Sequence, residues 1–494
     1  MLLTVLYIMA APLVVYSVWQ VTGVFVSVFF AARTDRPLCP KLANCKQEML
    51  AFLYPTCNDF SPEACDTLLR QKGVTFHLFI LDDSNSPDYQ ERIDRWAAAK
   101  TGFVTVVRRE NRRGFKGGNI NNWLMSYGEG SRYPYFLVVD ADEKLPPTFA
   151  NNLMSAIHAD SFAFVQAAHS GRADAETFIQ RMCSLQVDCI WFYEVPARQV
   201  IGIAPSLGHG ILFSKEAVSC VGGFPPVVSE DLGLTIRLAS DGQRGCYVTN
   251  VVGYEAFPRS YNAYWRRRRR WIQADAEIVW KLLPSLWRSD ISLAARVDLS
   301  LRETRLAVGS LHWFLLAIVS VLALSPSFAY LTLPVATHAV ALVWLVPIIV
   351  SVFIHGPTRM QKAWFVLFTP YLGMATSAIN PLASLEGFMG RVHFNPTGMR
   401  RGTKNPVCYL LWETVSGLVF LMAGVISGNF FLSAAGLAVA SSPLMRTDWE
   451  VPVLCVGALG FWTLIALQVS LDVANGGTSV LTIAVLVGLT LTLV

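Results

Sequence analysis

The feature that constrains this chain most is the separation of its charged residues from long uncharged stretches. No charged side chain occurs in residues 2–30, and stretches of similar apolar character recur at 306–324, at 335–354 and after 407. Each is about as long as the roughly 20 apolar residues that a helix needs to cross a bilayer. Most charged residues lie in 33–305, and only 15% of the chain is charged. We therefore expect a membrane protein with a large aqueous domain, and the composition excludes a plain soluble enzyme.

Basic residues beside the apolar stretches predict how the chain crosses the membrane. Residues 1–32 are followed by Arg33, Arg36 and Lys41 and lack the basic start of a cleavable signal, so we expect a retained transmembrane anchor. The positive-inside rule then places the aqueous domain, residues 33–305, in the cytoplasm. Reducing conditions there suit ten cysteines that form no CxxC pair. The predicted location is the inner (plasma) membrane, with several passes.

The remaining part, residues 306–494, is expected to form a transmembrane channel region. Residues 306–324 and 335–354 indicate a helical hairpin, and three or four further spans are expected from 407–426, 430–444, 451–471 and 479–494. The stretch 364–383 has basic residues on both sides and is interrupted by Pro370, Asn380 and Pro381. A single span cannot have both ends inside, so we predict an interfacial or re-entrant segment there, followed by a loop over 385–406.

Within the aqueous region, short apolar runs alternate with helical stretches. The runs at 49–54, 76–81, 104–107 and 135–139 are each followed by polar residues and are typical of buried strands. This alternation favours an α/β fold with a mostly parallel sheet flanked by helices. Sites in such sheets lie beyond the carboxyl ends of the strands.

Acidic residues follow two of these predicted strands. Asp82 and Asp83 come after 76–81, and Asp140 and Asp142 come after 135–139. Asp is common in turns and helix caps, but two acidic strand ends in one sheet need a neutralising cation. Mg²⁺ or Mn²⁺ held by a pair of carboxylates and by substrate phosphates fits such a place.

Two further segments could have a functional role or a purely structural one. Ser229, Glu230 and Asp231 precede the expected helix 232–238, where they can act as a cap, or Asp231 can act as a general base. The arginine run 266–270 is interleaved with aromatics, which indicates a helix at the membrane surface. A net charge of +5 is too small for a nucleic-acid-coating protein, so no nucleic-acid partner is expected. Anionic lipid and a phosphorylated substrate remain open as partners of the basic clusters.

In their order and spacing, these motifs resemble the D, DxD, TED and Q(Q/R)xRW pattern of processive family 2 glycosyltransferases of membranes, which include cellulose, hyaluronan, chitin and curdlan synthases. The resemblance covers residues 49–404 and implies a GT-A (Rossmann-like) cytoplasmic domain inserted between transmembrane helices. It also implies inverting transfer from a nucleotide diphosphate sugar and passage of the polymer through the membrane part. Four departures are Asp59 for Glu, Gly117 for Ala, Ser229 for Thr and Arg267 for the leading Gln.

The resemblance assigns expected roles by position. Asp231 is the expected base, with Glu230 beside it, and Asp140 and Asp142 are the expected metal ligands. The donor-binding set is Thr56, Asp59, Asp82, Asp83, Lys116, Asp140, Arg267 and Arg270. The acceptor-binding set is Trp271, Gly208, His209 and Gln166, and a gating loop is expected around Phe394 and Thr397.

The function predicted from this resemblance is processive synthesis of a β-linked polysaccharide, first of all a β-glucan from UDP-glucose. Its partners would be the UDP-sugar donor, the growing polysaccharide and the lipid bilayer, with room for an accessory export subunit. One alternative is a non-processive transferase that acts on a lipid acceptor. Another is a transporter or channel with a non-catalytic transferase-like domain.

Overall fold

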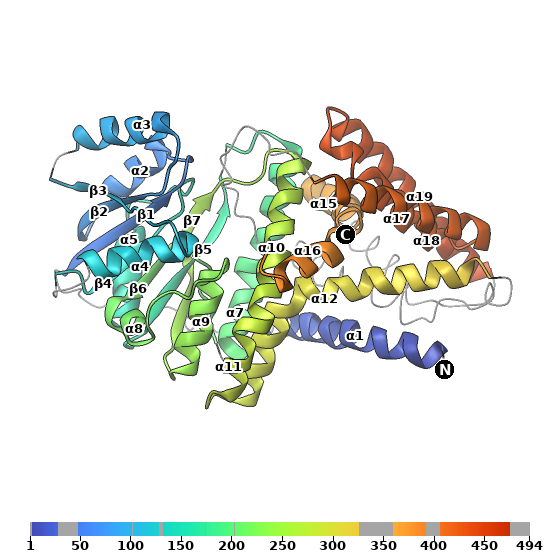
Figure 1. Cartoon of the computed structure of the whole chain (residues 1–494), viewed down its shortest axis with the longest axis horizontal. Helices are drawn as coiled ribbons and strands as arrows, with labels where there is room; N and C mark the ends of the chain where they lie inside the picture. Colours follow the sequence, from blue (N-terminus) through green and yellow to red (C-terminus); the bar gives the residue numbers. More distant parts are fainter. Residues whose placement is uncertain are drawn as a thin grey trace.

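A computed structural model describes residues 2–27, 48–100, 102–127, 132–172, 174–201, 203–325, 359–391 and 406–474. Its central element is a seven-stranded sheet with the order β3-β2-β1-β4-β6-β5-β7 (Figure 1). The strands are β1 (Met49–Thr56), β2 (Thr75–Asp82), β3 (Val104–Arg108), β4 (Tyr135–Val138), β5 (Phe164–Gly171), β6 (Ile211–Ser214) and β7 (Gly245–Glu255). The four predicted strands are confirmed, and β6 alone runs antiparallel to its neighbours.

The sheet is mostly apolar because helices cover both of its faces. In β1, Leu50, Phe52 and Tyr54 point to one face, where they pack with α2 (Pro62–Leu69), α3 (Pro87–Ala98) and α5 (Phe149–Ile157). Ala51 and Leu53 point to the other face, beside α4 (Phe115–Tyr127), α8 (Lys215–Cys220) and α9 (Glu230–Ser240). A strand buried on both faces gives a continuous apolar run, which is why the sequence revealed it.

Beyond the sheet, a second group of helices extends away from it (Figure 1). Its members are α6 (Phe178–Cys189), a π-helix (Ile190–Glu194), α7 (Val195–Ile201), α10 (Tyr261–Lys281), α11 (Leu283–Arg288), α12 (Leu293–Ala323), α15 (Arg359–Ala375), α16 (Ile379–Phe388), α17 (Val407–Ser427), α18 (Phe430–Ser441), a 3-10 turn (Leu444–Arg446) and α19 (Glu450–Ala474). The N-terminal stretch forms α1 (Leu2–Val26), which lies beside α12. A shared apolar core joins α6 and α10 to the C-terminal helices, so α10 belongs to both parts of the molecule.

The expected membrane segments are met in part. Among the described residues, Val407–Ser427 and Glu450–Leu471 are long and apolar enough to cross a membrane. A third span results if the two halves of α12, Leu293–Leu306 and Val308–Ala323, count together across their 53° bend. The helix α18 has only 12 residues. The expected spans 335–354 and 479–494 lie outside the described residues.

The stretch 364–383 is not one helix. It is divided between α15 and α16, which supports an interruption there, but the break falls at 376–378. Pro370 lies inside α15 and does not break it, whereas Asn380 and Pro381 lie in the first turn of α16. The expectation that Pro370 interrupts the segment is therefore wrong.

Candidate active site

The candidate site lies where β1, β2 and β4 end. These strands are parallel, so Thr56 at the end of β1, Asp82 at the end of β2 and Asp140 just after β4 reach the same edge of the sheet. The loop 203–210, which leads into β6, and the first turn of α9 approach the same edge. The fold thereby gathers acidic residues from distant parts of the sequence.

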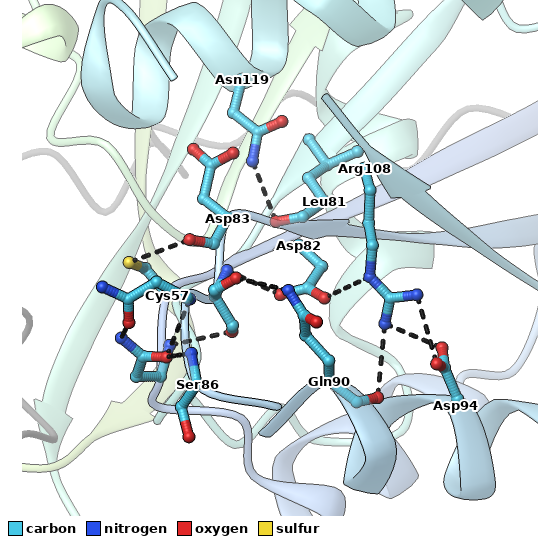
Figure 2. Close-up of polar contacts among 12 residues, drawn as sticks. Cys57, Leu81, Asp82, Asp83, Ser86, Gln90, Asp94, Arg108 and Asn119 are labelled. Carbon is cyan, nitrogen blue, oxygen red and sulfur yellow. Dashed lines mark hydrogen bonds and ion pairs between the residues drawn. The ribbon is translucent and has the colours of Figure 1, made fainter. Parts of the chain in front are cut away.

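Arginines neutralise the first acidic pair. Asp82 accepts a hydrogen bond from Arg108 Nε at 2.7 Å and one from the backbone N–H of Ser84 at 2.8 Å. Figure 2 shows that Arg108 also reaches Asp94, which lies on α3. Asp83 receives a two-pronged contact from Arg109, at 2.9 and 2.6 Å. The expectation that a divalent ion neutralises both acidic strand ends is therefore wrong for this pair, because Arg108 and Arg109 neutralise it.

The segment after β1 is held together by Asp59. Its Oδ1 accepts hydrogen bonds from Thr56 Oγ1 and from the backbone N–H of Cys57, both at 2.7 Å. Burial raises the pKa of Asp59, although these hydrogen bonds oppose the shift. Cys57 Sγ donates to the carbonyl oxygen of Asp83, so this segment is tied to the end of β2 (Figure 2).

The DxD segment carries excess negative charge, which suits a hard cation. Lys116 Nζ forms an ion pair with Asp140 and donates a hydrogen bond to the carbonyl oxygen of Gly208 at 2.7 Å. The pKa of Asp142 is raised to about 7 by burial, and further by the charges of Asp140 and Glu255. A bound cation would oppose this shift, because it favours the charged form of the carboxylate. Asp140 and Asp142 therefore fit Mg²⁺ or Mn²⁺, which prefer oxygen ligands.

A buried Glu–His pair supports the DxD loop, and the sequence analysis missed it. Glu143 Oε2 accepts from the backbone N–H of Asp140 at 3.1 Å, while Glu143 Oε1 lies 2.5 Å from His169 Nε2. His209 Nδ1 lies 3.7 Å from Glu143 Oε2, and the three residues offer ligand atoms within 4.8 Å of one another. They too could hold a metal ion. The available signal was the position of Glu143 directly after the DxD motif.

Two of the expected acceptor-binding residues have contacts within the protein. Burial lowers the pKa of His209, but Asp140, Glu143 and Glu255 outweigh it and raise that pKa to about 10. Gln166 is fully buried and uses its side-chain amide to hold the adjacent loop. Its Nε2 donates to the carbonyl oxygen of His209 at 2.9 Å, and its Oε1 accepts from the N–H of Leu207 at 2.8 Å.

The expected base lies against this loop. Gly208 has φ +86°, and a Cβ placed on it would lie 2.9 Å from Asp231 Oδ2. A Cβ on Gly117 would lie 2.8 Å from Cβ of Glu230, so α4 packs directly on the start of α9. Burial raises the pKa of both Glu230 and Asp231, and for Glu230 the charge of Asp231 adds to the shift. Ser229 is the N-cap residue of α9 but its side chain makes no capping hydrogen bond, while Glu230 and Asp231 lie in the first turn, so the capping alternative is met in part.

The helix α10 carries the run of five arginines, and one of them, Arg270, is within electrostatic reach of these carboxylates. Arg267 lies over the rings of Phe257 and Trp271, at 5.3 and 4.7 Å from their centroids. Within the described part of the chain, Arg267 Nε is buried without a hydrogen-bond partner. Burial and Arg267 lower the pKa of Arg270, while Asp140, Glu230 and Asp231 oppose the shift. Arg270 is therefore within electrostatic reach of the acidic site.

Two expectations concerned the side of the site that faces the membrane helices. Aromatic residues of α10 were expected at the membrane interface, but Tyr261, Tyr264 and Trp265 are buried against other helices, so this expectation is wrong for them. The expected loop 385–406 is wrong at its start, because residues 385–388 belong to α16, and Phe394 and Thr397, expected in a gating loop, lie outside the described residues.

Comparison with known proteins adds a family assignment for part of the chain. Residues 135–355 match the model of glycosyl transferase family group 2. A probable glycosyltransferase from Sulfolobus acidocaldarius is 26% identical over 227 residues, which cover 45% of this chain and 47% of that protein. A probable glucomannan 4-beta-mannosyltransferase 7 from Oryza sativa subsp. japonica is 26% identical over 226 residues, which cover 43% of this chain and 38% of that one. The chain thus spans less than half of the length of these relatives.

Among solved structures, one supports the fold. The mannosyltransferase PcManGT from Pyrobaculum calidifontis, in complex with GDP-Man and Mn²⁺, superposes with a TM-score of 0.50 at 17% identity. The match covers 78% of this chain and 99% of that one. The sheet and its helices therefore form a GT-A-like fold, residues 135–355 are similar to glycosyl transferase family group 2, and the chain has relatives named mannosyltransferases.

Proposed function

We propose that this chain is a membrane-associated inverting glycosyltransferase that moves a hexosyl group from a nucleoside diphosphate sugar to an acceptor hydroxyl. One observation carries the proposal. Lys116 forms an ion pair with Asp140 and donates a hydrogen bond to the carbonyl oxygen of Gly208, and Asp231 lies against Gly208. Asp140, the expected metal ligand, and Asp231, the expected base, therefore lie at the same loop, 203–210. Neither a channel nor a regulatory module requires that arrangement.

The chemistry we propose is a single displacement. Asp231 takes the proton of the acceptor hydroxyl as its oxygen forms a bond to the anomeric carbon, while the bond from that carbon to the diphosphate breaks on the opposite side. The base must be ionised to act, and the raised pKa values of Glu230 and Asp231 keep a proton near this pair at moderately low pH. The positive charge of Lys116 opposes both shifts and so favours the ionised base.

Charge on the departing diphosphate would be met from two sides. Asp140 and Asp142 would hold Mg²⁺ or Mn²⁺, which supplies positive charge to a leaving diphosphate when bound. From α10, Arg270 and the unpartnered Nε of Arg267 add fixed positive charge. Water can reach Asp140 in the unliganded site, because its side chain is 40% exposed.

The identity of the donor is the finer part of the proposal. UDP-glucose was the expectation from the sequence, whereas the relatives are named mannosyltransferases and the solved neighbour contains GDP-Man. We therefore place GDP-mannose first and UDP-glucose second. Inversion of either α-linked donor gives a β-linked product.

Processive synthesis and export through the membrane helices remain part of the proposal. Two observations support them: Trp271 lies beside the site arginines, where an indole face can stack on a sugar ring, and α10 shares its core with the C-terminal helices. A polymer leaving the site would then meet the membrane part directly. A lipid-linked single sugar is the alternative product.

The test is turnover by the full chain in lipid nanodiscs. Wild-type protein is incubated with GDP-mannose, UDP-glucose and other nucleotide sugars, each with Mg²⁺ or Mn²⁺, and nucleoside diphosphate release and product size are measured. Release with one donor, together with a β-linked product, supports the proposal. No release with any donor overturns it, and a product carrying one sugar on lipid overturns processivity alone.

A further inference from the structure

The five consecutive arginines of α10 point in all directions around the helix, and only some face the site. Arg270 is within electrostatic reach of the acidic site, and Arg267 and Trp271 contact each other on the same helix. Trp265, Arg269 and Gln273 are spaced by four residues and therefore form a separate stripe. This stripe faces α16 and α17 on the membrane side, where α10 and α16 lie side by side (Figure 1).

One carboxylate on α16 binds most of this stripe. Glu386 accepts hydrogen bonds from both Nε and Nη2 of Arg269, at 2.8 to 3.1 Å, and from Gln273 Nε2 at 2.6 Å. It also accepts from the hydroxyl of Tyr409, on α17, at 2.5 Å. Arg269 in turn lies over the Tyr409 ring, 4.6 Å from its centroid. Glu386 thus connects three helices through a largely buried ion pair, since the side chains of Arg269 and Glu386 are only 13% and 22% exposed.

The backbones of α10 and α16 also approach closely beside this carboxylate. A Cβ on Gly387 would collide with the carbonyl oxygen of Gln273 and would lie 2.8 Å from Cβ of Ala276. Helices in such close contact cannot slide or rotate freely past each other, because their surfaces interdigitate. The position of Glu386 relative to α10 is therefore well defined.

A second carboxylate holds the preceding turn of the stripe. Glu413, on α17, is fully buried, accepts from Trp265 Nε1 at 2.7 Å and forms an ion pair with Arg446. A slip of α10 by one residue would rotate it by about 100° and move it by about 1.5 Å, taking Arg270 and Trp271 away from the carboxylates. Both anchors oppose that motion.

We propose that Glu386 is a positioning residue for transfer: through Arg269 and Gln273 it sets the rotation and height of α10, and so places Arg270 and Trp271 against the acidic site. The inference rests on the proposed function and adds that the membrane helices act on chemistry through this carboxylate. Among the described residues, Glu386 itself contacts none of the expected donor or acceptor residues. Because it acts on them only through α10, which carries Arg270, its loss is expected to lower turnover much more than it weakens nucleotide binding.

The test uses the full chain in nanodiscs and compares variants at the same site. Glu386→Ala should lower the turnover number for transfer on the order of 100-fold, as expected for a misplacement near 1 Å, while the Kd for the nucleoside diphosphate rises far less, by about the few-fold that a displaced Arg270 accounts for. Glu386→Gln and Tyr409→Phe preserve more of the contacts and should lower turnover less, with an unchanged melting temperature. Exchanging the charges in Arg269→Glu with Glu386→Arg should recover part of the loss relative to either single change. Glu91→Gln breaks an exposed ion pair with Arg95 and serves as the control without effect.

The outcomes separate the two proposals. Wild-type turnover by Glu386→Gln and Tyr409→Phe would overturn the positioning role and leave the transferase function standing. Turnover, nucleotide affinity and melting temperature that fall together would also overturn it, because Glu386 would then only support the fold. Absence of turnover in the wild-type protein would remove the basis of both.

Discussion

Alanine at Gly208 tests whether Asp231 lies where the chemistry requires it. Gly208 has φ +86°, and a methyl group there would lie 2.9 Å from Asp231 Oδ2 and 3.3 Å from Asp231 Cγ. These contacts are too short, so the carboxylate or the loop must move. The carbonyl of Gly208 also accepts from Lys116, so a moved loop disturbs the donor side as well.

The expected magnitudes are distinct for stability and for activity. An alanine in the left-handed region costs about 1–2 kcal/mol, which lowers the melting temperature by roughly 2–4 °C per kcal/mol in a domain of this size. A displaced base costs more in rate, and we expect a loss of roughly 10- to 100-fold in turnover. The two losses must be measured separately.

Gly222 provides the matched control. Its φ is +75°, and nothing lies within 4 Å of a Cβ built on it. Gly222→Ala should therefore cause a similar loss of stability with no loss of turnover per folded molecule. Thermal unfolding and nucleoside diphosphate release are measured for both variants. Equal turnover in Gly208→Ala and Gly222→Ala would refute the placement of Asp231 as the base.

Three further predictions address the metal, the acceptor and pH. Asp142→Ala should weaken nucleotide binding in Mn²⁺ as well as turnover, by calorimetry and product release, and full activity in excess chelator would contradict the metal role. Trp271→Ala should lower polymer yield more than donor hydrolysis, because water needs no stacking platform; a parallel fall of both would make Trp271 a structural anchor. Burial raises the pKa of Glu230 and Asp231, so turnover should rise with pH as this pair loses its proton. Lys116→Met removes a charge that lowers both pKa values, and should move the rise to higher pH in a kcat/KM profile; an unmoved profile would contradict the assignment.

Much of the sheet could be predicted because its strands are buried on both faces. Successive residues of β1, such as Phe52 and Leu53, point to opposite faces of the sheet and pack in two different cores, so the run is apolar throughout. By contrast, β5 carries the polar residues Gln166 and His169, and the apolar run at β6 has only three residues, 211–213. Neither strand gives a clear pattern, and the antiparallel direction of β6 depends on tertiary contacts that no local signal contains.

The candidate site shows the same division. Residues directly after strands, such as Asp82 and Asp140, could be identified because parallel strands end at one edge. Their partners could not, since Arg108 is 26 residues from Asp82 and Glu386 is 117 residues from Arg269. A run of basic residues gives the charge of a surface but not which carboxylate each side chain meets.

The central claim is that Asp231 is the base of a glycosyl transfer. Its most direct test is Asp231→Asn in the full chain, measured for nucleotide affinity and for transfer in one preparation. We predict unchanged nucleotide binding and a loss of transfer of roughly 10²- to 10⁴-fold, the contribution typical of a positioned base. Transfer by Asp231→Asn at the wild-type rate would contradict the account.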